Sequence, residues 1–308
     1  MITIELYNPN WPIYFSEEAK KIKQVLGGNC LTVHHIGSTS IIGLPAKPVI
    51  DMVPVVKDIL QVDLCNDGME QLDYVIKGEN GILFRRFFQK KHPPISFNVH
   101  VYQENNPEIV HYLKFKEFMN THSEARLDYA KLKKELAKKY PHDMYEYVSG
   151  KNQFVQEINQ RAGCQGTRIV HALLKPEWAA YYTILNSEFY NPLHQKPILQ
   201  SNHPSSTSQA HLIFSQGSLL MGAAQFEFLE HTTAILRALA IIKNKQKQGF
   251  GSQFLALLEL WIKHQGCSYL VCHAPLTTES FFKKTGYNPL SFNVPAPDYP
   301  AISLGKKV

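Results

Sequence analysis

The stretch Gln246-Lys247-Gln248-Gly249-Phe250-Gly251-Ser252 joins an apolar run typical of a strand, residues 233–242, to an amphipathic run typical of a helix, residues 254–264. Two glycines one residue apart allow a tight turn that gathers backbone N–H groups. The helix that follows adds unpaired amides and the positive end of its dipole. The stretch therefore predicts a phosphate-binding loop, with a plain strand-to-helix turn as the alternative.

The residues after this loop continue the alternation of helix and strand. Gly266 ends the helix, residues 268–273 form a strand-like run, and residues 278–287 form a short helix that ends at a glycine. This order resembles the GNAT acyltransferase family. The Q/R-x-x-G-x-G/A signature of that family falls on Gln246, Gly249 and Gly251, and its closing F-Y-x-x-x-G-F pattern falls on residues 281–287. The resemblance covers residues 166–308 and implies a mixed sheet with helices on both faces.

The same resemblance implies a cofactor site. Acetyl-CoA would lie in a split between the fourth and fifth strands of this domain, with its pyrophosphate on the loop and its pantetheine along a strand edge. The cofactor-binding residues that this implies are Leu239, Ala240, Ile241, Gln246, Lys247, Gln248, Gly249, Phe250, Gly251, Ser252 and Phe282. The acceptor would be an amine, on a small molecule or on a protein, that no sequence motif identifies.

Catalysis by such a domain commonly uses a glutamate, acting through water, as the base and a tyrosine as the acid. Glu227 and Glu230 stand near the strand before the split and are candidate bases, although either is alternatively an exposed strand carboxylate. Phe282 occupies the position of the tyrosine, and a phenyl ring cannot donate a proton. Tyr287 and His273 are the candidate substitutes. An acyl-CoA-binding sensor without catalysis is therefore a second hypothesis.

Length and composition predict two domains, and the alternation of strand-like and helix-like runs predicts the α/β (α+β) class. The 308 residues are 44% apolar and 19% charged, which is typical of a soluble globular protein, and we place the domains at residues 1–163 and 164–308. The apolar runs are too short to cross a membrane, and the first residues lack the pattern of a signal peptide. We expect a cytoplasmic protein. Its five cysteines, odd in number and without a C-x-x-C pair, are expected to be free thiols.

The formal net charge of +6 lies mostly in the second half of the chain. Residues 1–163 hold 20 basic and 19 acidic side chains, and the other half holds 12 and 7. This excess suits an anionic cofactor such as coenzyme A, with a solvated basic face as the alternative. It falls short of the basic stripe typical of nucleic-acid binding.

The first half contains a second glycine turn, His35-Ile36-Gly37-Ser38-Thr39-Ser40, followed by the apolar run 49–56 with Asp51 inside it. An aspartate in a buried strand needs a reason. A Gly-Ser turn can present amides and a hydroxyl to a triphosphate while a carboxylate on the next strand holds Mg²⁺. Alternatively, Ser38 or Arg86 satisfies Asp51 within the core.

These residues, together with residues 43–48, 85–88 and 98–101 and a helical tail that ends near residue 154, resemble the GrpB family over residues 1–163. The family implies a nucleotidyltransferase-like mixed sheet with helices, and a nucleotide or a phosphate as a ligand. The implied ligand-binding residues are Gly37, Ser38, Lys47, Asp51, Arg86 and His100.

The second carboxylate that active nucleotidyltransferases usually carry is replaced by Val53. We therefore expect no metal site and no nucleotidyl transfer in the first domain. A nucleotidyl- or phosphotransferase working from this domain is the third hypothesis. Residues 107–162 are helical and charged, and the lysine run at 131–139 is interpreted as a solvated face.

Overall fold

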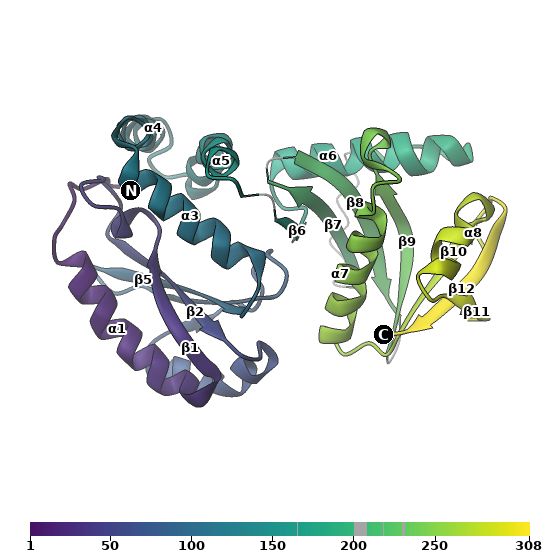
Figure 1. Cartoon of the computed structure of the whole chain (residues 1–308), viewed down its shortest axis with the longest axis horizontal. Coiled ribbons are helices and arrows are strands. Elements are labelled where there is room, and N and C mark those ends of the chain that lie inside the picture. Colours follow the sequence, from purple (N-terminus) through teal and green to yellow (C-terminus); the bar gives the residue numbers. More distant parts are fainter. Residues whose placement is uncertain (165, 200–207, 218, 230–231) are drawn as a thin grey trace. The chain divides into compact units, whose positions relative to one another are not determined.

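The computed structural model describes residues 1–164, 166–199, 208–217, 219–229 and 232–308. The chain divides into two compact units, Met1–Thr167 and Arg168–Val308 (Figure 1). The predicted boundary, between residues 163 and 164, lies a few residues before this division. That each unit folds by itself stays a prediction.

The first unit is built on a mixed sheet of five strands in the order β1-β2-β5-β4-β3. β2 and β5 pair in parallel, and the other neighbouring strands pair antiparallel. Its elements are α1 (Trp11–Leu26), β1 (Cys30–Ile36), β2 (Val49–Val56), α2 (Asn66–Gln71), β3 (Val75–Ile76), β4 (Arg85–Lys90), β5 (Ser96–Gln103), α3 (Pro107–Thr121), α4 (Ser123–Lys139) and α5 (Met144–Arg161).

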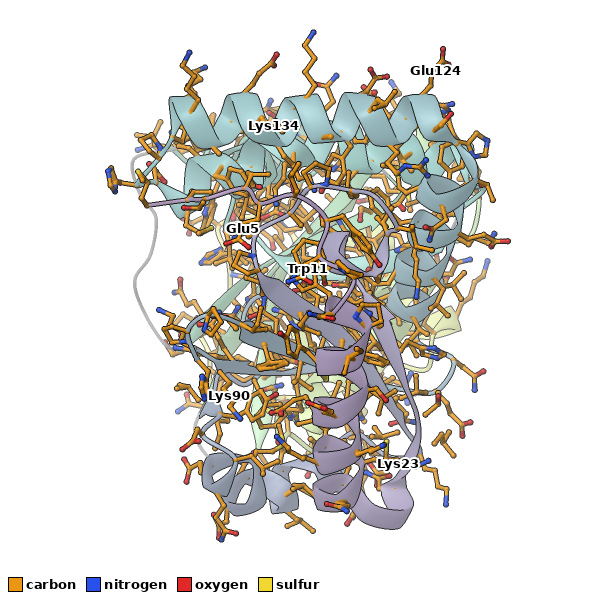
Figure 2. The ribbon with its side chains drawn as sticks, turned by 90° about the vertical axis from the view of Figure 1, so that its left-hand side faces the viewer. Glu5, Trp11, Lys23, Lys90, Glu124 and Lys134 are labelled. Carbon is orange, nitrogen blue, oxygen red and sulfur yellow. The ribbon has the colours of Figure 1, made fainter. Side chains whose placement is uncertain are left out.

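Successive side chains of β2 point to opposite faces of this sheet. Ile50 and Met52 belong to a core that includes Trp11, which is fully buried at the first turn of α1 (Figure 2). Val53 belongs to a different cluster, with Ile109 of α3. The alternation therefore directs Asp51 toward the face that carries α3, and away from α1.

The second unit is built on a mixed sheet of seven strands in the order β11-β12-β10-β9-β8-β7-β6. β9 and β10 pair in parallel, whereas β10 pairs antiparallel with β12. Its elements are β6 (Thr167–His171), α6 (Lys175–Leu185), β7 (Gln209–Gln216), β8 (Leu219–Phe228), β9 (Thr233–Ile241), α7 (Phe250–His264), β10 (Tyr269–Pro275), α8 (Glu279–Lys284), β11 (Asn288–Pro289) and β12 (Ala301–Lys307).

Helices cover both faces of this second sheet. His211 of β7 hydrogen-bonds to Tyr181 of α6, while Phe214, three residues later, stacks on Phe254 of α7. Since side chains alternate along a strand, the odd separation places the two helices on opposite faces. The predicted class, two domains each with a mixed sheet and helices, is confirmed.

Two further observations concern the chain as a whole. All five cysteines are free thiols, as predicted, and three of them are buried. Among the described residues, none of the helices combines the length and the apolar character that a membrane span needs.

Candidate functional site

The parallel pairing of β9 and β10 ends halfway along the two strands. The pairing runs from Thr233 and Tyr269 to Leu236 and Cys272. Beyond these residues, β9 continues to Ile241 and β10 to Pro275, and the two strands no longer pair with each other. Beyond this point the strands diverge, because β10 keeps its antiparallel partner β12 and β9 keeps its partner β8. The predicted split between the fourth and fifth strands is therefore present in the structure.

A cavity of about 120 Å³ lies at this split. Leu239 of β9, Cys272 of β10 and Phe282 of α8 all line it, together with residues between 188 and 193, which follow α6. Ala240 and Ile241 lie further along β9 and are buried. Of the three predicted edge residues, only Leu239 therefore faces this cavity.

The predicted loop leads from β9 into the first turn of α7. The side chain of Gln246 donates to the carbonyl of Ile241, 2.8 Å away, which anchors the start of the loop to the strand. Gly249 has φ +87°, a left-handed conformation that favours glycine, and its carbonyl accepts from Gln253 N–H as the helix begins. The amides of residues 250–252 precede Gln253 and have no carbonyl one turn earlier in the helix. Amides without a helical partner at the positive end of α7 are suited to donate to an anion.

The other predicted loop residues differ in their surroundings. Lys247 has φ +57°, and the Gln248 side chain donates to the carbonyl of Asn244 at 2.8 Å. A Cβ on Gly251 would lie 3.5 Å from the Phe281 ring, which is an ordinary contact, so α8 packs close to the start of α7. The loop and the closing aromatic motif are thus joined through Phe281.

Tyr287 is not at the cavity. It is 1% exposed and lies edge-on to Phe282, with ring centroids 5.2 Å apart. Burial and the nearby carboxylate of Glu259 raise the pKa of Tyr287, so that its proton is held tightly. The position of Tyr287 therefore disfavours it as the substitute for the missing tyrosine, because its side chain is buried in the core and does not line the cavity at the split.

A second, more polar cavity of about 380 Å³ meets the first one. Four residues line both cavities: Phe189, Leu236, Arg237 and His273. Glu227 lines the larger cavity, and Arg237 donates to its Oε2 from Nε at 2.9 Å and from Nη2 at 2.7 Å. None of the hydrogen bonds among the described residues engages Oε1. The other candidate base, Glu230, lies outside the described residues.

His273 occupies the junction of the two cavities. Its Nε2 lies 3.3 Å from the carbonyl of Val294, which can only accept, and its Nδ1 lies 3.1 Å from the hydroxyl of Ser303. These two partners favour the tautomer with the proton on Nε2, in which Nδ1 accepts from Ser303.

In the first unit, Asp51 lies against the Gly37 turn. A Cβ on Gly37, which has φ +68°, would lie 2.5 Å from Asp51 Oδ2, so only glycine fits there. Asn98 donates to Asp51 Oδ1 at 2.8 Å, and His100 Nε2 lies 3.7 Å from the same oxygen. Burial raises the pKa of Asp51, but His100, Asn98 and the charge of Lys47 lower it by more, so the carboxyl is ionised.

Arg86 is not part of this arrangement. It forms an ion pair with Asp63, at 2.6 Å from Nε to Oδ1. Its neighbour Arg85 instead points toward Asp51's side of the sheet, where Nη1 lies 3.1 Å from His100 Nδ1. The side chains of β4 alternate, so only one of two adjacent arginines can reach that face. The suggestion that Ser38 or Arg86 satisfies Asp51 is corrected: Asn98 and His100 are its neighbours.

The interpretation of the lysine run on α4 as a solvated face is wrong for one of its members. Lys133 is 2% exposed and donates to the carbonyl of Pro45. The spacing Tyr129-x-x-x-Lys133, repeated on α5 as Tyr147-x-x-x-Lys151, was the available signal, because residues four apart share a helix face.

Comparison with known proteins matches each half of the chain to a different family. Residues 1–161 match the family described as GrpB protein, and residues 178–287 match the family described as Acetyltransferase (GNAT) family. The UPF0157 protein YqkA of Bacillus subtilis (strain 168) is 38% identical over 161 residues, which are 52% of this chain and 47% of that protein. The chain thus spans about half the length of that relative.

Solved structures are similar to each half separately. The conserved protein GrpB from Enterococcus faecalis is 38% identical, covers 52% of this chain and 96% of its own, and has a TM-score of 0.49. The ribosomal-protein-S18-alanine N-acetyltransferase from Escherichia coli is 17% identical, covers 46% of this chain and 94% of its own, and has a TM-score of 0.37.

Proposed function

We propose that this chain, which belongs to the GrpB family and carries a GNAT acetyltransferase domain in residues 178–287, is an acyl-CoA-dependent N-acetyltransferase acting on an amine. The observation that carries the proposal is the split between β9 and β10, which opens a cavity beside Leu239 and Phe282. The split occurs in the same unit as a glycine turn that aims helix amides outward. Acetyl-CoA is a long anionic thioester: the glycine turn suits its pyrophosphate, and the cavity at the split suits its acyl end.

The residues of this chain fit acetyl-CoA. The amides of residues 250–252 and the side chains of Lys245 and Lys247 offer positive charge to a pyrophosphate. The unpaired edge of β9 near Leu239 offers backbone groups to a pantetheine amide, and the apolar cavity between Cys272 and Phe282 suits an acetyl group. Acetyl-CoA supplies an acyl group that is already activated for transfer.

The larger cavity is the proposed acceptor side. Glu227 lines it, and this cavity meets the cavity at the split beside Arg237. In the proposed reaction the amine nitrogen attacks the thioester carbonyl carbon, the new C–N bond forms, and the C–S bond breaks. The proton lost by the amine passes to Glu227, directly or through water. Arg237 holds Oε2 and so leaves Oε1 as the basic atom.

Protonation of the departing thiolate is assigned to water or to His273. Phe282 has no proton to give, and Tyr287 is in the core. His273 lies at the junction of the two cavities, and its ring can give a proton to the thiolate only in the imidazolium form, which leaves the neutral ring behind. If neither serves, the unit is a sensor that binds acyl-CoA without turnover, which is the alternative function.

Residues 1–163 are proposed to bind a ligand or partner and not to transfer nucleotidyl groups. Asp51 is already engaged by Asn98, and the position of a second carboxylate is Val53, which is 1% exposed among apolar side chains. An in-line displacement with two metal ions needs carboxylates that bridge both ions. Release of pyrophosphate from ATP or GTP that depends on Mg²⁺ and is lost in Asp51→Ala would contradict this assignment.

The test of the acetyltransferase proposal compares two substitutions at Gly249. Aspartate and asparagine have similar size, both tolerate a positive φ better than other side chains, and no atom lies within 4 Å of a Cβ at this position. Only aspartate adds a negative charge beside the proposed pyrophosphate. Calorimetry should show acetyl-CoA binding by the wild type that weakens by ~10²-fold or more in Gly249→Asp and much less in Gly249→Asn.

The accompanying assay measures release of free CoA from acetyl-CoA in the presence of a panel of amines. Turnover with any amine, lost in Glu227→Gln with acetyl-CoA affinity retained, supports the enzyme. Binding without turnover supports the sensor. Equal binding by the wild type and Gly249→Asp would overturn the assignment of this loop and most of the case for an acyltransferase.

A further inference from the structure

Two lysines of the first unit are buried in contrasting ways. Lys90, labelled in Figure 2, is 7% exposed and lies 3.1 Å from Glu18 Oε1, where Tyr74 also donates at 3.0 Å. Lys133 is even more buried, and the partner of its ammonium is the uncharged carbonyl of Pro45. A buried charge without a counter-charge is costly, and proteins normally avoid it. Lys133 therefore requires an explanation that Lys90 does not.

Lys133 belongs to a repeated arrangement on two packed helices. Its Nζ lies 4.8 Å from the ring centroid of Tyr129 on α4, and Lys151 Nζ lies 4.5 Å from the ring centroid of Tyr147 on α5. Gly150 permits the close packing of these helices, since a Cβ there would lie 2.5 Å from Leu136 Cδ2. The aromatic faces attract the ammonium groups but do not neutralise them.

A third lysine joins this pair from the loop before β2. Lys47 Nζ lies 5.3 Å from the same Tyr147 ring centroid, so the ammonium groups of Lys47 and Lys151 are less than 10 Å apart. Burial lowers the pKa of both lysines, Lys151 to about 8, and each interacts electrostatically with the single carboxylate of Asp51. Among the described residues, no carboxylate lies within salt-bridge distance of Lys47, Lys133 or Lys151. Lys47 and Lys151 thus share one acid that neither of them touches, whereas the charge that acts on Lys133 is the like charge of Lys151.

The three lysines converge on the glycine turn. Tyr129 interacts with the Ser38 side chain and with Asp51, and Gly37 lies against the Asp51 carboxylate. Lys47 and Lys151 are half-buried, so part of each side chain is exposed to solvent. A hydroxyl, a glycine turn and an excess of positive charge are therefore linked by contacts in one region of the first unit.

We propose that Lys47 and Lys151, with Ser38, bind the phosphate groups of a ligand directly and without a divalent cation, while the buried charge of Lys133 attracts the same phosphates from behind Lys151. The proposal deepens, and rests on, the ligand-binding role proposed for residues 1–163. Lysine ammonium groups act as point charges that bind phosphate well. Three of them can neutralise the negative charge of the phosphates that Mg²⁺ neutralises at other sites. Asp51 is bonded to Asn98 and faces His100, and no group of three His, Cys, Asp or Glu side chains suited to a metal occurs among the described residues.

An oligophosphate is the ligand class that fits best. A single phosphate carries less negative charge than two or three linked phosphates, and it balances three ammonium charges spread over two helices and a loop less well. Inorganic tripolyphosphate is the probe for this chemistry, inorganic phosphate tests a single group, and ATP tests whether a nucleoside adds affinity.

The experiment measures tripolyphosphate binding to the full chain by calorimetry, in EDTA and again in Mg²⁺. All proteins carry Gly249→Asp, which removes the pyrophosphate site proposed for the second unit. We expect binding in EDTA, weakened about 10- to 100-fold by Lys151→Gln and by Lys133→Gln. Lys134→Gln on α4 (Figure 2) is the matched control, because Lys134 is exposed, and it should bind as its parent does.

If Lys133→Gln fails to fold, Lys151→Gln still tests the proposal, because Lys151 is half-buried on α5 and its replacement is less damaging to the fold. Binding that occurs only with Mg²⁺, or that is equal in Lys151→Gln and Lys134→Gln, would overturn the proposal. Absence of binding in EDTA would do the same. The acetyltransferase proposal is judged separately, by acetyl-CoA binding and CoA release in proteins with an intact Gly249, so either proposal can fail alone.

Discussion

Replacement of Lys133 by methionine tests whether its ammonium group is as poorly solvated as the structure indicates. Lys133 is 2% exposed, and burial together with the charge of Lys151 lowers its pKa to about 7. In the unfolded chain the pKa of a lysine is about 10.4. Between about pH 7 and pH 10 the folded chain therefore holds fewer protons than the unfolded chain, and the free energy of unfolding rises with pH.

The magnitude follows from these two pKa values. The penalty on the folded state is complete below about pH 7 and is relieved as the pH rises toward about 10. At ~1.4 kcal/mol per pKa unit, Lys133 contributes a gain on the order of 2 kcal/mol in the free energy of unfolding between pH 7 and pH 9. Methionine cannot titrate, so the variant lacks this gain. Its lost hydrogen bond to Pro45 costs about 1 kcal/mol, largely independent of pH.

Native-state hydrogen exchange of amides in β2 and β5 measures this free energy in the full chain. Wild type and Lys133→Met are compared at pH 7, 8 and 9, so the intrinsic exchange rate cancels at each pH. The buffers contain no phosphate, and Lys151, whose pKa is about 8, titrates in both proteins. Lys134→Met controls for the loss of a lysine from an exposed position of the same helix. A difference between wild type and Lys133→Met that is constant from pH 7 to pH 9 would refute the reasoning.

Three further predictions concern other parts of the chain. Phe282→Tyr restores a hydroxyl at the split and should leave acetyl-CoA affinity nearly unchanged while raising CoA release; a weaker turnover would argue against a missing acid. Glu18→Gln leaves Lys90 buried without its counter-charge and should destabilise the first unit by about 3–5 kcal/mol in urea, whereas Lys21→Ala, which removes a half-exposed partner, should cost under ~1 kcal/mol. Separate chains 1–163 and 166–308 should each give a cooperative melt, and aggregation of both would mean that the units share a core.

The order of elements and the turns that join them could be predicted from the sequence, because these depend on neighbouring residues. The turn around Gly249 needs a positive φ and a helix start, and both requirements act within a few residues. The apolar runs that form β2 and β9 predict strands from their own residues, without reference to distant parts of the chain. The positions of the candidate loop and of the Gly37 turn in the chain follow from such local patterns, whereas the contact of Gly37 with Asp51 depends on the pairing of β1 with β2.

Only the tertiary structure decided which polar side chains meet. Arg85 and Arg86 are indistinguishable in the sequence, and the pairing of β4 with β5 selected Arg85 for the face of His100. Strand register depends on contacts between distant segments, and a shift of one residue reverses the faces. In the same way, Tyr287 turned into the core and Lys133 left the solvated face of α4 because neighbouring helices cover them. Burial of a charge is a property of the packed chain, and no local pattern fixes it.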